Sequence, residues 1–88
     1  MARFEMFEVG QGTAGTAPQA EILLERGMMY ATGRDCAVDL VSAHKWFNIA
    51  AIKGSDRAAR LRSELSSTMT KAEIARALRA AREWMTVH

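Results

Sequence analysis

Apolar residues recur every three or four positions along most of this chain, which is the spacing of one face of an α-helix. Four stretches show this pattern and predict helices over about residues 18–32, 39–53, 56–67 and 71–86. The first two helices are expected to face inward through Ile22, Leu23, Gly27, Tyr30 and Ala31, and through Val41, Ala43, Trp46, Phe47, Ala50 and Ala51. The last two are expected to face inward through Ala58, Ala59, Leu61, Leu65 and Met69, and through Ile74, Ala77, Leu78, Ala81 and Trp84 or Met85. The predicted fold class is therefore all-α.

Residues that favour helix ends stand at the borders of these stretches. Pro18 suits a first helical turn, and Gly33 and Gly54 suit the positions just after a helix. The expected N-caps are Asp39, Ser55 and Thr70, the last in a capping box with Glu73. Short connections then predict two stacked antiparallel hairpins. Ala43 to Trp46 and Ala81 to Trp84 repeat one short pattern at about the spacing of helix-pair repeats.

Residues 1–17 differ from the rest and are expected to form an N-terminal arm followed by a linker. Phe4 and Phe7 belong to an apolar segment, whereas residues 10–17 are rich in Gly, Thr and Ala, as in flexible linkers. Such an apolar arm either docks on the helical body or on a second copy, or is disordered; we expect docking. The helical domain itself is predicted over residues 18–88.

Length and composition narrow the class of protein. A chain of 88 residues forms one domain with a thin core, and a single cysteine excludes an internal disulfide framework. No apolar run approaches the roughly 20 residues that a membrane helix needs. Glu5 and Glu8 interrupt the segment in which a signal peptide would need an apolar core. We therefore expect a cytoplasmic location and no membrane association.

The net charge of +2 hides an uneven distribution. Residues 1–40 contain three basic and six acidic residues, whereas residues 41–88 contain nine basic and four acidic ones. The basic half could face an acidic partner or nucleic acid. The alternative is a pair of solvated faces that attract one another within or between chains. We favour this second interpretation because acidic residues interrupt the basic ones at helical spacing.

Residues 27–54 resemble the Sel-1-like repeat, a tetratricopeptide-like helix–turn–helix family. The residues that carry the resemblance, at the family's spacing, are Gly27, Tyr30, Gly33, Asp39, Ala43, Lys45, Trp46, Phe47, Ala50, Ala51 and Gly54. The resemblance extends more weakly over about residues 19–86. Two positions depart from the family pattern: Arg26 replaces a leucine, and the loop Asp35–Asp39 lacks a glycine.

The resemblance implies a right-handed α-α superhelix whose concave groove binds a protein or peptide. Family members are adaptors in bacterial signalling and in eukaryotic protein quality control, and the family has no catalytic residues to transfer to this chain. Since a stack of two hairpins leaves apolar ends uncovered, we expect the chain to form a homo-oligomer or to cap itself with its arm.

Few residues are candidates for chemistry. His44 has no partner at metal-ligand spacing, and Cys36 is interpreted as an inert, buried thiol. We therefore expect neither an enzyme, nor a metal site, nor a cofactor. The candidate partner-binding residues are Phe4, Phe7, Met28, Met29, Arg76, Arg79 and Arg82.

The predicted function is a non-catalytic adaptor that binds a protein or peptide through its helical-repeat groove. The alternative is a small nucleic-acid-binding regulator that uses the basic helices of the C-terminal half. We regard nucleic acid as the less favoured partner, because the row of Arg76, Arg79 and Arg82 has no interleaved aromatic residues and no DNA-reading motif.

Overall fold

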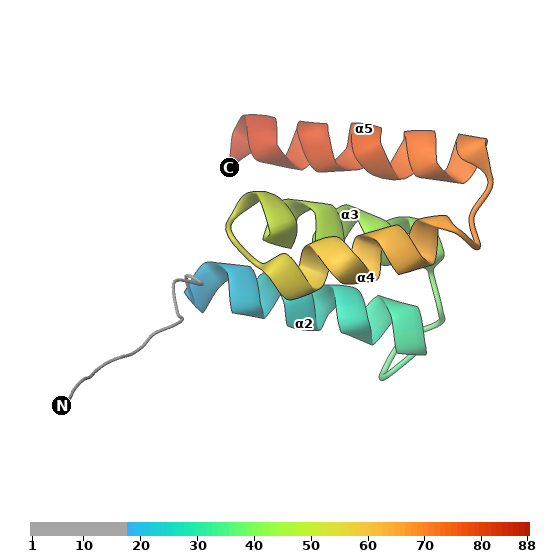
Figure 1. The fold of residues 1–88 in the computed structure, drawn as a ribbon, viewed down its shortest axis with the longest axis horizontal. Coiled ribbons are helices and arrows are strands. Elements are labelled where there is room, and N and C mark those ends of the chain that lie inside the picture. Colours follow the sequence, from blue (N-terminus) through green and yellow to red (C-terminus); the bar gives the residue numbers. More distant parts are fainter. Residues whose placement is uncertain (1–17) are drawn as a thin grey trace, which may run out of the picture.

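The computed structural model describes residues 18–88, which form four α-helices joined by short turns (Figure 1). The helices are α2 (Pro18–Thr32), α3 (Leu40–Ile52), α4 (Asp56–Ser66) and α5 (Lys71–Val87). α2 and α3 run antiparallel, and so do α4 and α5. The described chain is thus all-α and built from two antiparallel helix pairs, as predicted. The predicted arm and linker, with Phe4 and Phe7, lie outside the described residues.

Local side-chain chemistry sets the helix starts. Asp39 and Ser55 each accept a hydrogen bond from the backbone N–H three residues later, both at 3.0 Å. The capping box is also present: Thr70 Oγ1 accepts from the N–H of Glu73 at 3.1 Å, and Glu73 Oε1 accepts from the N–H of Thr70 at 2.8 Å. These caps satisfy backbone donors that have no partner within the helix. Every observed helix bound lies within one residue of its predicted position.

The loop after α2 needs two residues with left-handed backbone. Gly33 has φ 75°, and its N–H and that of Arg34 both donate to the carbonyl of Met29, at 2.9 and 3.1 Å. Asp35 has φ 64° and occupies the loop position where the Sel-1-like pattern has glycine. Aspartate is one of the few residues that tolerate this conformation. Asp35 therefore supplies the second left-handed residue of the loop.

α3 is the central helix of the described chain. α2, α4 and α5 each pack on it, whereas α4 and α5 contact one another little. In Figure 1, α3 lies between α2 and α5, and α4 crosses in front of it. The main apolar cluster of buried residues comprises Leu23, Leu24, Ala43, Trp46, Phe47, Ile49, Ala50, Ala58 and Ala81. Because α3 is covered on several sides, six of its 13 residues are buried, compared with two of the 17 residues of α5.

The inward face of α2 is rotated relative to the prediction. Ile22 was expected to face inward, but its side chain is 60% exposed, whereas Leu24 is 1% exposed. The buried residues of α2 are Ala20, Leu23, Leu24 and Gly27, which follow the i, i+3, i+4, i+7 spacing of a helix packed on one neighbour. The assignment of Ile22 to the core was therefore wrong.

Two further assignments differ in α3 and α5. Leu78 was expected in the core but is exposed, because α5 contacts α3 through a narrow stripe at Ala77 and Ala81. Ile49 was not assigned to the core but is fully buried, since neighbouring helices cover more than one face of α3. A helix with several neighbours buries residues outside a single amphipathic stripe.

Gly27 lies at a close approach of α2 to α3. A Cβ atom added at this position would lie 2.5 Å from Cδ1 of Phe47 and 3.3 Å from the carbonyl oxygen of Ala43. The first distance is far below a van der Waals contact, so no side chain fits without movement of the ring or of a helix. The interpretation of Gly27 as a close-approach residue is confirmed.

Candidate binding groove

An apolar groove opens between the C-terminal half of α2 and the C-terminal half of α4. Its volume is about 330 Å³, and it is open to solvent. The lining residues are Met28, Ala31 and Thr32 from α2, Phe47 from α3, and Leu61, Glu64, Leu65 and Thr68 from α4 and the turn after it. Five of these residues are apolar, and the polar ones are two threonines and one glutamate.

The groove exists because α2 and α4 pack on α3 and hardly on each other. α3 contributes the ring of Phe47 as the floor, and the two outer helices form the walls. On α4 the lining positions Leu61 and Leu65 are four residues apart, which places them on one face of the helix, and Thr68 follows in the turn after it. The groove is therefore a consequence of helix packing and of residue spacing on two helices that are distant in sequence.

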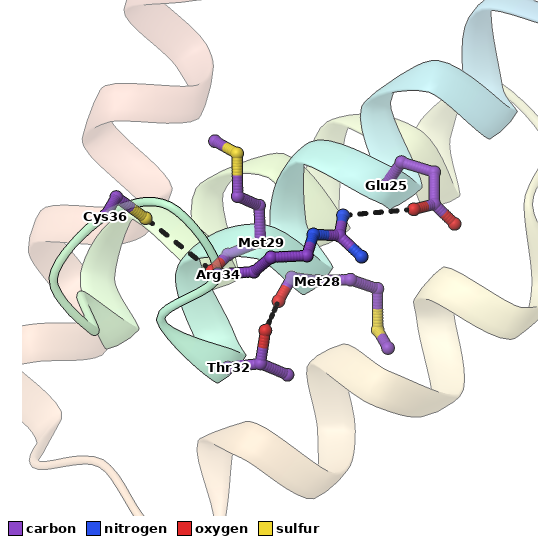
Figure 2. A network of polar contacts seen from close by, with 6 residues as sticks. All are labelled: Glu25, Met28, Met29, Thr32, Arg34 and Cys36. Carbon is purple, nitrogen blue, oxygen red and sulfur yellow. Dashed lines mark hydrogen bonds and ion pairs between the residues drawn. The ribbon is translucent and has the colours of Figure 1, made fainter.

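Met28 and Met29 of α2, both candidate partner-binding residues, point in different directions. Figure 2 shows the side chain of Met28 pointing toward α4, and that of Met29 pointing away from it. Met28 lines the groove and packs against the core, whereas Met29 does not line it. Consecutive helical residues point about 100° apart, so the pair cannot serve one surface.

The carbonyl of Met29 is instead a structural acceptor at the end of α2. Cys36 Sγ lies 3.6 Å from this oxygen, in addition to the two backbone donors of the loop (Figure 2). Cys36 is a free, half-buried thiol. An exposed ion pair between Arg34 and Glu25, at 3.3 Å, ties the same loop to α2. Such exposed pairs contribute about 0–1 kcal/mol, so the glycine and the carbonyl contacts define the loop.

A second hollow lies between the C-terminal ends of α3 and α5. Its volume is about 360 Å³, and its lining residues are Asn48, Ile52, Ala81, Arg82, Met85 and Thr86. Of the three predicted arginines, Arg82 lines this hollow, whereas Arg76 and Arg79 line neither depression. All three are exposed. The structure therefore does not gather the predicted partner-binding residues into one site.

Trp46 joins the two helix pairs. Its ring meets that of Trp84 edge to face, with centroids 5.5 Å apart. Arg26 Cζ lies 4.7 Å from the Trp46 ring centroid, and Lys45 Nζ lies 4.3 Å from it. Cations over a tryptophan ring are attracted to its negative face. Arg26 is thus a cation–π partner of Trp46.

His44 is a buried polar residue whose role could not be read from the sequence. Its side chain is 2% exposed, and its Nε2 lies 2.9 Å from Ser66 Oγ. The Ser66 hydroxyl donates to the carbonyl of Arg62 at 2.9 Å, so it accepts from the Nε2–H of His44. His44 Nδ1 is buried without a hydrogen-bond partner among the described residues. His44 thus ties α3 to the end of α4 in its neutral form.

The burial of His44 predicts a pH-dependent stability. Desolvation lowers the pKa of His44 below its ordinary value of 6.5, and the nearby Arg62 guanidinium lowers it further. Below that value the unfolded chain takes up a proton that the folded chain resists, so the free energy of unfolding falls as the pH falls. We expect the melting temperature to decrease as the pH is lowered from about 8 to about 5.

The matched control is His44→Gln, whose amide can donate to Ser66 but cannot be protonated. This variant should show a flatter profile over the same range. Asp39 also makes stability depend on pH, but in a separate and more acidic range, because hydrogen bonds from the backbone and side chain of Ser42 lower the pKa of Asp39 below 3.8. Equal slopes in the wild-type and His44→Gln proteins above about pH 5 would contradict the assigned role of His44.

Residues 18–88 provide little else for a chemical site. No group of three or more His, Cys, Asp or Glu side chains in this range lies close enough to hold a metal ion. None of the four described helices is both long and apolar enough to span a membrane. No protein-family model, curated protein or solved structure matches the chain. The resemblance to the Sel-1-like repeat therefore stays a prediction based on residues 27–54.

Proposed function

We propose that this protein is a non-catalytic interaction module that binds a protein or peptide in the groove between α2 and α4. The observation that carries this proposal is the apolar groove itself, with Met28, Leu61 and Leu65 on its walls and Phe47 on its floor. Its volume of about 330 Å³ lies at the lower end of ligand sites in general. It suits one or two bulky apolar side chains better than a large cofactor.

The composition of the groove favours a peptide ligand. Met28 is an adaptable apolar contact of the kind found on binding surfaces that accept varied side chains. Thr32, Glu64 and Thr68 supply polar groups around the apolar surface, which is the usual arrangement of an interface. An amphipathic helix whose apolar residues lie three or four positions apart would match this groove.

A peptide library panned against the intact protein tests the proposal. We expect the selected peptides to share bulky apolar residues at helical spacing and to bind the groove. Thr68→Arg, which places a long charged side chain over an exposed rim position, should weaken their binding by about tenfold or more, or about 1.4 kcal/mol. Fluorescence anisotropy with labelled peptides measures this change.

Thr86→Arg is the matched control. Thr86 is also exposed, its hydroxyl also donates to a carbonyl in the preceding turn, and it lines the second hollow. Its substitution should leave peptide affinity within about twofold. If Thr86→Arg weakens binding and Thr68→Arg does not, the ligand site lies between α3 and α5 and the proposed groove is wrong.

A second candidate function is supported by the charges of α5. Arg76, Arg79 and Arg82 are exposed and form no ion pair with any carboxylate of residues 18–88. Exposed arginines of this kind could contact the phosphates of a nucleic acid. Binding of a mixed-sequence oligonucleotide that weakens steeply with salt and is unaffected by Thr68→Arg would favour this function over the first.

A further inference from the structure

We propose that the α2/α4 groove is covered in the free protein by the chain's own N-terminal segment, residues 3–9, which any external partner must displace. This inference rests on the proposed function, because it assigns a regulator to the same groove. It also selects between the two docked states that the sequence left open, the body of the same chain and a second copy.

The chemistry of the segment matches that of the groove. Phe4 and Phe7 are three positions apart in the sequence, which is the spacing of one face of a helical turn, and each is followed directly by a glutamate, Glu5 or Glu8. Phenylalanine rings bury a large apolar area, and the groove walls offer mainly methionine, leucine and alanine. Arg3, next to Phe4, complements Glu64 on the groove.

The reach of the connecting residues favours docking within one chain. Met28 lies ten residues along α2 from Pro18, which corresponds to about 15 Å at the rise of an α-helix. Residues 10–17 form an eight-residue connection with three glycines, for which a root-mean-square span of about 16 Å is expected. A linker whose span matches the distance to the site gives the highest effective concentration, about 1 mM.

The other occupants fit less well. A second copy would compete with the tethered segment only at protein concentrations approaching about 1 mM. The second hollow has a similar volume to the groove but is more polar, because Asn48, Arg82 and Thr86 contribute half of its lining residues. The groove between α2 and α4 is therefore the site that best accepts two phenylalanine rings from the same chain.

A peptide of residues 1–12 carrying a fluorescent label tests the inference. The peptide is titrated against the full-length chain and against the full-length Phe4→Ser/Phe7→Ser variant. If the tethered segment covers the groove, the variant should bind the peptide about tenfold more tightly, for a segment with an intrinsic Kd of about 0.1 mM. The matched control is Glu5→Ser/Glu8→Ser, which keeps both rings and should resemble the wild-type chain.

The outcomes separate this inference from the proposed function. Equal, Thr68→Arg-sensitive binding to the wild-type and Phe4→Ser/Phe7→Ser chains would overturn the covering segment, while the groove would stand as a peptide site. Absence of binding to either chain would also overturn the inference, and the library peptides would then decide on the groove. Binding that Thr86→Arg weakens and Thr68→Arg does not would overturn both.

A disulfide test locates the segment directly. In a Cys36→Ser background, Glu5→Cys is combined with either Thr68→Cys beside the groove or Thr86→Cys beside the second hollow. Mild oxidation should form a disulfide within one chain in the first pair and much more slowly in the second. A covalent dimer would overturn docking within the chain in favour of a second copy. Faster closure with Thr86→Cys would overturn the assignment of the groove.

Discussion

Replacement of Trp46 by alanine is expected to cost about 3–5 kcal/mol of folding free energy. The indole ring is only 8% exposed and belongs to the main core cluster. It also contacts Trp84 of α5 and carries Arg26 and Lys45 over its ring. A domain of this size has roughly 3–5 kcal/mol of stability, so the variant should be largely unfolded at room temperature.

Far-UV circular dichroism during urea denaturation measures this loss. Trp46→Phe is the first control, because it retains an aromatic ring and should be far less destabilising than Trp46→Ala. Trp84→Ala is the second control, since Trp84 is half-buried and should cost less than Trp46. A Trp46→Ala protein with wild-type stability would be incompatible with α3 as the centre of the fold.

Replacement of Gly27 by alanine is expected to destabilise the protein by about 1–3 kcal/mol. This direction is informative, because alanine in a helix is otherwise favoured over glycine by about 0.5–1 kcal/mol. The opposite sign is expected here since the new Cβ would lie 2.5 Å from the Phe47 ring. Urea denaturation of the single variant gives the sign and the magnitude.

The contact with Phe47 can be isolated by a double-mutant cycle. Phe47→Leu removes Cε1 and the rest of the rigid ring beyond the Cδ atoms, and its shorter side chain can turn away from residue 27, at the cost of a cavity. In the Phe47→Leu background, Gly27→Ala should therefore cost much less than it does alone, with a favourable coupling of about 0.5–3 kcal/mol. A Gly27→Ala variant more stable than wild type would show that α2 and α3 do not approach at this position.

The features that depend on neighbouring residues could be predicted from the sequence. The N-caps Asp39 and Ser55, the capping box at Thr70 and the left-handed Gly33 each require only a few residues in a row, and all were found. The close approach at Gly27 could be anticipated because its spacing relative to Ala43 and Phe47 follows a helix-hairpin pattern.

The features that depend on which helix lies against which could not be predicted in the same way. Ile22 and Leu24 are equally apolar, so their order of burial depends on the rotation of α2 against α3. Ile49 is buried because three helices pack on α3. The hydrogen bond of His44 could not be predicted because its partner Ser66 lies on another helix, α4. The cation–π contact of Arg26 likewise depends on the position of Trp46 in another helix.

The candidate groove falls between these cases. Met28 could be named from the sequence as a surface methionine, but its partners Leu61 and Leu65 lie on α4 and were assigned to the core stripe of that helix. Both leucines are half-buried and serve the core and the groove at once. The groove becomes visible only when α2 and α4 are placed side by side on α3.

The central claim, that the groove between α2 and α4 binds a peptide, is tested most directly by an NMR titration. The ¹⁵N-labelled full-length protein is titrated with the tightest peptide selected from the library, and backbone amide shifts are followed. The largest shifts should cluster on Met28, Ala31, Leu61, Leu65 and Thr68. Shifts confined to the arginine row of α5 or to the hollow around Ile52 would contradict the claim.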